Sequence, residues 1–159
     1  MTFEELNLEL ETLIGQVVSF KRVACDSVII YFFGGPGDPS DLSVFIDPTW
    51  RYEQEGKVIL GSYDVSMDES EFDSKEQCLQ AFHHLASYMD DLVGASLLKF
   101  QVDPLSSDIT MEFSGGRVLR SFVNSAFEDT AWTYRNYPKK FYAQVSSRGI
   151  IVGELSAKP

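Results

Sequence analysis

The chain has 159 residues, 44% of them hydrophobic and 13% aromatic, so it can form one compact domain and is not an intrinsically disordered protein. The net charge of −11 would repel a phosphate backbone, and nucleic acid is therefore not an expected partner. No run approaches the ~20 apolar residues of a membrane span, and the first residues do not form a secretory signal, so we expect a cytoplasmic protein that does not contact the membrane.

The N-terminal segment is predicted to form an amphipathic helix. A capping box of Thr2 and Glu5 marks its start, because both side chains can accept hydrogen bonds from backbone N–H groups of the first turn. Gly15 marks its end, since glycine enters the left-handed conformation without a steric cost. The apolar residues recur at spacings of three and four: Phe3, Leu6, Leu10 and Leu13.

Short apolar stretches separated by turn residues follow, and they predict an antiparallel meander of strands. Gly34 and Gly35 are expected to form a tight turn within it. The expected strands are 17–23, 27–33, 42–47, a Trp-x-Tyr segment at 50–52, and 58–61. Next comes an acidic connector, residues 64–73, which has neither strand nor helix periodicity and is predicted to be an exposed loop.

The second half of the chain repeats this order of features. Its helix starts with a capping box of Ser74 and Gln77 and ends at Gly94, and a shift of 79 residues aligns it with the first helix. The matching strands are 96–102, 108–114, 119–124, a second Trp-x-Tyr segment at 132–134, and 150–153, with insertions on both sides of 132–134.

These correspondences predict an α+β fold made by tandem duplication of a helix and an antiparallel meander. The repeats are residues 1–73 and 74–159, combined in a single compact domain with two helices packed on antiparallel sheets. Whether the sheets pack face to face or join edge to edge does not follow from the sequence.

The sequence contains no pattern typical of a catalytic or metal-binding site. It lacks a Gly-x-Ser-x-Gly segment and a phosphate-binding loop, and the acidic connector does not have the spacing of a calcium loop. His83 and His84 would point about 100° apart on a helix, so they cannot share a metal ion. Cys25 and Cys78 lie in apolar patterns and are expected to be buried free thiols. We expect no enzymatic activity, no metal and no cofactor.

The two Trp-x-Tyr segments admit two interpretations. Their side chains, Trp50, Tyr52, Trp132 and Tyr134, are of the amphipathic type that anchors binding surfaces. Residues present in both copies of a duplication usually serve the fold, however, and core packing is the favoured interpretation.

The excess negative charge is confined to the first half of the chain. Residues 1–74 carry fifteen acidic and four basic side chains, whereas residues 75–159 carry nine of each. Solubility alone can account for this excess, but a field of one sign also attracts partners of the opposite sign. In size, charge and lack of catalytic motifs the whole chain resembles small acidic bacterial immunity proteins. That resemblance implies a single domain that blocks the active cleft of a basic toxin.

Under this hypothesis an aromatic anchor and acidic side chains of the first half contact the partner. The predicted contact residues are Trp50, Tyr52, Glu53, Glu55, Asp64, Asp68, Glu69 and Glu71. Two other functions stay open: a small-molecule or sensory domain with a pocket between the repeats, and an enzyme of unrecognised type. The oligomeric state is also open, because an exposed edge strand could support a homodimer.

Overall fold

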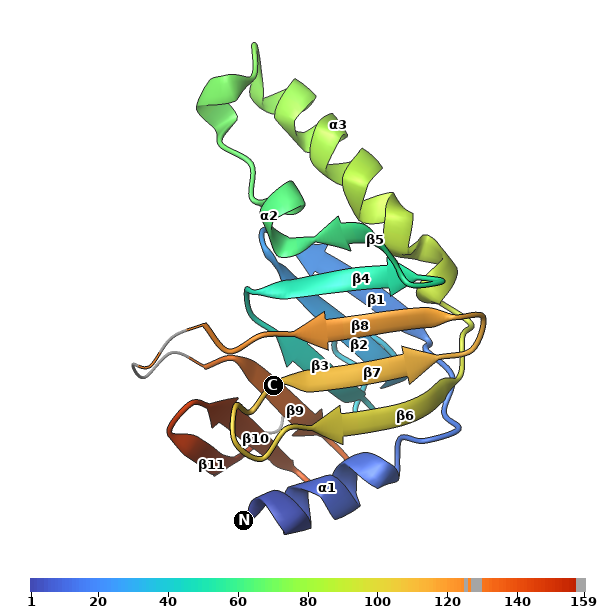
Figure 1. Cartoon of the computed structure of the whole chain (residues 1–159), viewed down its shortest axis with the longest axis vertical. Coiled ribbons are helices and arrows are strands. Elements are labelled where there is room, and N and C mark those ends of the chain that lie inside the picture. The colour runs from blue at the N-terminus through green and yellow to red at the C-terminus, as the bar shows by residue number, and fades with distance from the viewer. Residues whose placement is uncertain (125, 127–129, 157–159) are drawn as a thin grey trace.

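Two antiparallel β-sheets packed face to face form the body of the molecule (Figure 1). This computed structural model describes residues 1–124, 126 and 130–156, so the end of the predicted second repeat, residues 157–159, lies outside the described part. The structure confirms the predicted α+β class, with helices added to antiparallel sheets.

One sheet has six strands and the other has five. The order in the six-stranded sheet is β1 (Phe20–Ala24), β2 (Ser27–Phe33), β3 (Leu42–Ile46), β9 (Trp132–Asn136), β10 (Phe141–Ser146) and β11 (Gly149–Glu154). The order in the five-stranded sheet is β5 (Lys57–Gly61), β4 (Trp50–Gln54), β8 (Arg117–Ser121), β7 (Ile109–Phe113) and β6 (Leu97–Val102).

Each sheet combines strands from both halves of the chain. The strand that carries each Trp-x-Tyr segment leaves its own meander and pairs with the third strand of the other half: β9 pairs with β3, and β4 pairs with β8. In these pairs Tyr134 lies opposite Val44, and Tyr52 lies opposite Leu119. The two halves therefore share both sheets and one hydrophobic core.

The crossing between the halves uses equivalent hydrogen bonds. The N–H of Gly15 donates to the carbonyl of Leu97 at 2.7 Å, and the N–H of Gly94 donates to the carbonyl of Val18 at 2.9 Å. Both glycines have a positive φ, +86° and +91°, as expected at these helix ends. The halves thus match in strand order and in backbone contacts, while their origin by duplication stays a prediction from the sequence.

Helices close the sandwich at both ends, and their starts agree with the sequence. The helix α1 (Phe3–Glu11) begins with the predicted capping box of Thr2 and Glu5. The helix α3 (Lys75–Ala86) begins at Ser74, whose side chain accepts a hydrogen bond from the N–H of Gln77, and continues as the 3₁₀ helix η2 (Ser87–Leu92). No helix in the described part of the chain combines the length and the apolar character needed to cross a membrane.

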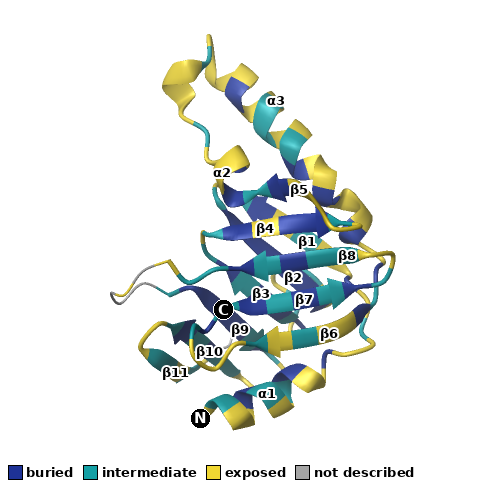
Figure 2. Ribbon diagram, in the orientation of Figure 1, coloured by how far each residue is buried: buried dark blue, intermediate teal, exposed yellow. Residues whose placement is uncertain are grey.

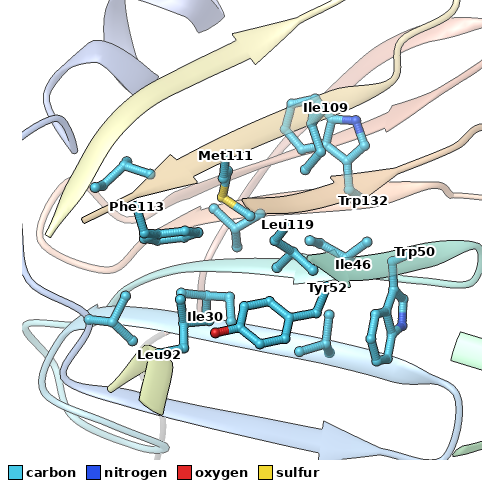
Figure 3. Close-up of a cluster of buried hydrophobic side chains, with 14 of the residues drawn as sticks. Ile30, Ile46, Trp50, Tyr52, Leu92, Ile109, Met111, Phe113, Leu119 and Trp132 are labelled. Atoms are coloured by element: carbon cyan, nitrogen blue, oxygen red, sulfur yellow. The ribbon is translucent and has the colours of Figure 1, made fainter. Parts of the chain in front are cut away.

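The core lies between the sheets (Figures 2 and 3). Its largest fully buried side chains are the aromatic residues of the two Trp-x-Tyr segments, and leucines of α1 are fully buried as well. Aliphatic residues of β2, β3, β7 and β8 fill the remaining space. The interface between the two halves is therefore filled by side chains.

Two strand predictions need correction. The eighth strand lies at 117–121 and not at 119–124. The residue of β8 that is equivalent to Val44 of β3 is Leu119, because each lies opposite the tyrosine of a Trp-x-Tyr segment. The tenth strand, β10, lies in a segment that the sequence comparison treats as an insertion, yet it occupies the place of β5 beside the Trp-x-Tyr strand, so the match of 58–61 with 150–153 is wrong. The acidic connector also contains two short helices, α2 (Ser62–Val65) and η1 (Glu69–Glu71), where a loop was predicted.

Candidate functional site: an acidic projection and its groove

A segment at the junction of the two halves extends away from the sandwich (Figure 1). It consists of α2, η1 and the first turns of α3, residues 62–81, and we call it the acidic projection. The segment contributes no strand to either sheet, so its side chains are not tied to the pairing of the sandwich, and this makes the projection a candidate for function.

Short-range hydrogen bonds shape the projection. The carboxylate of Asp64 accepts from the N–H of Gly61 at 2.8 Å and stabilises the start of α2. The carboxylate of Asp68 accepts from the N–H of Ser70 at 2.8 Å and caps η1. Hydrogen bonds from Ser70 hold the pKa of Asp68 below its usual value, so this carboxylate stays ionised at neutral pH.

Negative charge covers the projection. Its six carboxylates are all exposed, and Lys75 is its single basic residue. Glu69 and Glu71 make no side-chain hydrogen bond or ion pair within the described residues, so their charges face solvent. The carboxylates are Asp64, Asp68, Glu69, Glu71, Asp73 and Glu76.

Exposed apolar side chains accompany these charges. Tyr63 on α2 is 91% exposed, and Leu79 on α3 is 47% exposed. Side chains of these two kinds can anchor a protein partner, since aromatic and apolar groups provide much of the energy at protein interfaces. The sequence analysis missed both residues; the position of Tyr63 directly before the acidic connector is a signal that could have indicated the first of them.

An apolar pocket of about 230 Å³ lies at the base of the projection. The turn between β1 and β2 forms one side, with Cys25 and Asp26, and α3 forms the other. Carboxylates of Asp26 and Glu69 stand among otherwise mostly apolar lining residues, which are Val65, Met67, Cys78, Leu79 and Phe82. The pocket can therefore accept an apolar side chain next to a cationic one.

A second hollow continues from this pocket along the edge of the six-stranded sheet. It lies between β1 and α3 and has a volume of about 510 Å³. Cys25 and Phe82 line both hollows, so together they form one groove, which we call the β1–α3 groove. Its far end is closed by Lys21, whose Nζ donates to the carbonyl of Ala86 at 2.6 Å and pairs with Asp90 at 2.8 Å.

The two aromatic residues predicted to contact a partner are buried in the structure. Trp50 is 1% exposed and Tyr52 is fully buried, so neither can serve as an anchor for a partner in this conformation. The indole N–H of Trp50 donates to the carbonyl of Asp26 at 2.6 Å, and the hydroxyl of Tyr52 donates to Asp91 at 2.8 Å. The core interpretation of the Trp-x-Tyr segments is the one that the structure supports.

The predicted acidic contacts fall into two groups. Asp64, Asp68, Glu69 and Glu71 come together on the projection. Glu53, however, is buried on the five-stranded sheet, where its carboxylate pairs with Arg51 and Arg120. Glu55 is exposed but lies in the turn between β4 and β5, at the other end of β5 from the projection.

The cysteine prediction is half wrong. Cys78 is buried, but Cys25 is exposed because it occupies the turn between β1 and β2, where its φ is +53°. Both thiols are free, and both line the pocket at the base of the projection.

The described residues offer no cluster of three or more side chains able to hold a metal ion. His83 and His84 are both exposed on α3, and the ring of His84 lies 3.2 Å from the hydroxyl of Tyr88.

Burial, together with the hydrogen bond to Asp91, raises the pKa of Tyr52, so this hydroxyl stays protonated and acts as a donor in the core.

Comparison of the chain with protein-family models, with curated proteins and with solved structures gives no match.

Proposed function

We propose that this chain is a non-enzymatic protein-binding module that neutralises a basic protein partner, as an immunity protein blocks a toxin in the cytoplasm. The observation that carries this proposal is the acidic projection, which presents six exposed carboxylates together with the exposed side chains of Tyr63 and Leu79. Complementary charge speeds the encounter with a basic partner and selects against acidic ones. Exposed apolar side chains then supply the contacts that hold the complex.

In the described part of the chain, the carboxylates of the projection take no part in the ion pairs of the sandwich, and this also supports the proposal. On the sandwich, the buried carboxylate of Glu53 pairs with the partly exposed Arg51 and Arg120, while the carboxylates of Glu69 and Glu71 remain in water. Reversing these two charges should therefore leave folding intact. A change in binding would then report on the surface alone.

Two variants with the same net charge test the proposal. Glu69→Lys with Glu71→Lys alters the projection, whereas Glu11→Lys with Glu154→Lys alters exposed carboxylates elsewhere. Each immobilised variant is exposed, at low and at high salt, to lysate of cells that encode the chain and to the purified products of neighbouring genes. We expect a stoichiometric basic protein that the wild type and the second variant retain at low salt, and that the projection variant loses at least tenfold. Equal retention by the two variants, or a partner that is acidic, would contradict the proposal.

A further inference from the structure

A helix lies along one edge strand of each sheet, but the two helices are not equally well buried. The helix α1 packs against β6, the edge strand of the five-stranded sheet, and its Leu6 is fully buried. The equivalent edge of the six-stranded sheet is β1, and the equivalent helix is the second half of α3. Leu85, which aligns with Leu6, is only partly buried. The β1–α3 groove is the space that this less closely packed helix leaves open.

An edge strand presents backbone groups that can pair with another strand. In the described sheet, β2 is the only neighbour of β1, and the groove runs along the free side of residues 21–25. One wall is therefore a strand edge, and the other is formed by Phe82, His83 and Ala86 of α3. An extended peptide segment fits between a strand edge and a helix, since it can hydrogen-bond to the first and pack against the second.

The charged residues at the two ends of the groove differ in sign. Lys21 and Arg22 lie toward its closed end, and the charge of Lys21 is neutralised by Asp90. Asp26 and Glu69 lie at its open end, next to the carboxylates of the acidic projection. A segment that enters the groove is thus favoured when its basic residues lie at the open end and its apolar residues along the strand.

We propose that the β1–α3 groove binds an extended segment of the basic partner, which adds to the six-stranded sheet as a seventh strand antiparallel to β1. This inference rests on the proposed function and specifies how the partner is recognised. The segment has lysine or arginine at its N-terminal end, beside the projection, and alternating β-branched residues after it. One apolar side chain of the segment enters the pocket lined by Cys25, Cys78 and Phe82.

The test uses the full chain labelled with ¹⁵N and two synthetic peptides. The first has three N-terminal lysines followed by alternating valine and threonine; the second is identical except for two central prolines, which prevent pairing with a strand. Amide hydrogen exchange is followed in β1 and in β11, the other edge of the same sheet. We expect the first peptide to slow exchange of amides in residues 20–24 at least tenfold, with β11 unchanged, and to bind at least tenfold more tightly than the proline peptide.

A matched pair of variants completes the experiment. His83 lines the groove and His84 does not, although both are exposed neighbours on α3. We expect His83→Trp to fill the groove and weaken binding of the lysine–valine peptide at least tenfold, while His84→Trp leaves it within twofold.

Each contrary outcome has a separate meaning. Equal binding of the two peptides, with exchange in β1 unchanged, would overturn strand addition while leaving a basic partner at the projection intact. Protection at β11, or dimerisation of the chain through β1, would also overturn it, in favour of unselective edge pairing or of a second copy as occupant. Failure of both peptides to bind would overturn it as well, and the charge-reversal experiment would still decide the proposed function.

Discussion

The two tryptophans connect the sheets through matched hydrogen bonds. Trp50 donates from its indole N–H to the carbonyl of Asp26 at 2.6 Å, and Trp132 donates to the carbonyl of Ser107 at 2.8 Å. Each acceptor lies in the connection between the first two strands of the same half, on the sheet opposite the tryptophan. A tryptophan is suited to this position because its large apolar body fills the core while its N–H satisfies a carbonyl.

Replacement of either tryptophan by phenylalanine should therefore destabilise the fold. Trp50→Phe and Trp132→Phe each remove one hydrogen bond and leave unfilled volume in the core, so we expect the free energy of unfolding to fall by about 1–3 kcal/mol for each. Urea unfolding measures this loss, with Tyr63→Phe as an exposed control that stays within about 0.5 kcal/mol. A loss at one position only would show that the two sites are not energetically equivalent.

The buried tyrosines predict sensitivity to high pH. Burial raises the pKa of Tyr134 to about 12, and burial with the hydrogen bond to Asp91 raises that of Tyr52. Because the folded pKa exceeds the unfolded value of about 10, the stabilisation is complete below pH 10 and is lost as the pH rises through the folded pKa.

Urea unfolding at pH 8 to 11.5 checks this, with Tyr134→Phe as the comparison. We expect the wild type to lose more of its free energy of unfolding above pH 10 than the variant does, since the variant has one tyrosine fewer to ionise. Parallel losses would show that Tyr134 does not contribute.

At the scale of elements, two glycines end the helical segments and start the crossing of the chain to the other half. Gly15 and Gly94 have positive φ, and an added Cβ would have no other atom within 4 Å at either position. Any cost of a side chain there comes from the backbone conformation and not from a collision.

Gly15→Ala and Gly94→Ala should each lower the free energy of unfolding by about 1–2 kcal/mol. Gly35→Ala is the matched control, because Gly35 also has open space around it but no positive φ, and it should stay within about 0.5 kcal/mol. The midpoint of urea unfolding measures all three. A destabilised control would indicate that contacts, and not the left-handed conformation, determine the effect.

At the scale of the molecule, neither half of the chain has a complete sheet. The six-stranded sheet contains β1, β2 and β3 from the first half, and the five-stranded sheet contains β6, β7 and β8 from the second. The remaining strands of each sheet come from the other half, so division of the chain would expose both faces of the shared core.

Fragments 1–73 and 74–159 should consequently fail to fold alone. We expect each to lack a cooperative thermal transition and dispersed amide signals, and an equimolar mixture to regain both. Circular dichroism and ¹⁵N spectra provide the measurement. A fragment that folds cooperatively without the other would contradict the interdependence of the halves.

The sequence predicted those features that depend on neighbouring residues. The strand 27–33 was predicted at its correct bounds, because it is a continuous apolar run between turn residues. The helix starts at Thr2 and Ser74 and the left-handed glycines also follow from local hydrogen bonding and local sterics. Exposure of Asp68, with Glu69 and Glu71, was predictable as well, since charged side chains without partners stay in water.

Only the tertiary structure decided which strands pair across the molecule. The shift of β8 by two residues escaped the sequence comparison because such a shift leaves each side chain on the same face of the sheet. The strand β10 has the alternation of a strand, with Phe141, Ala143 and Val145 on one face, but the sequence comparison placed it in an insertion, and its pairing with β9 and β11 is what identifies it. The burial of Glu53 likewise requires Arg120, which pairing with β8 brings beside it. Sequence alone determined most of the local elements and the acidic surface. The exchange of Trp-x-Tyr strands and the β1–α3 groove depend instead on contacts between residues far apart in the chain. Those contacts form because they bury the core that the two halves share.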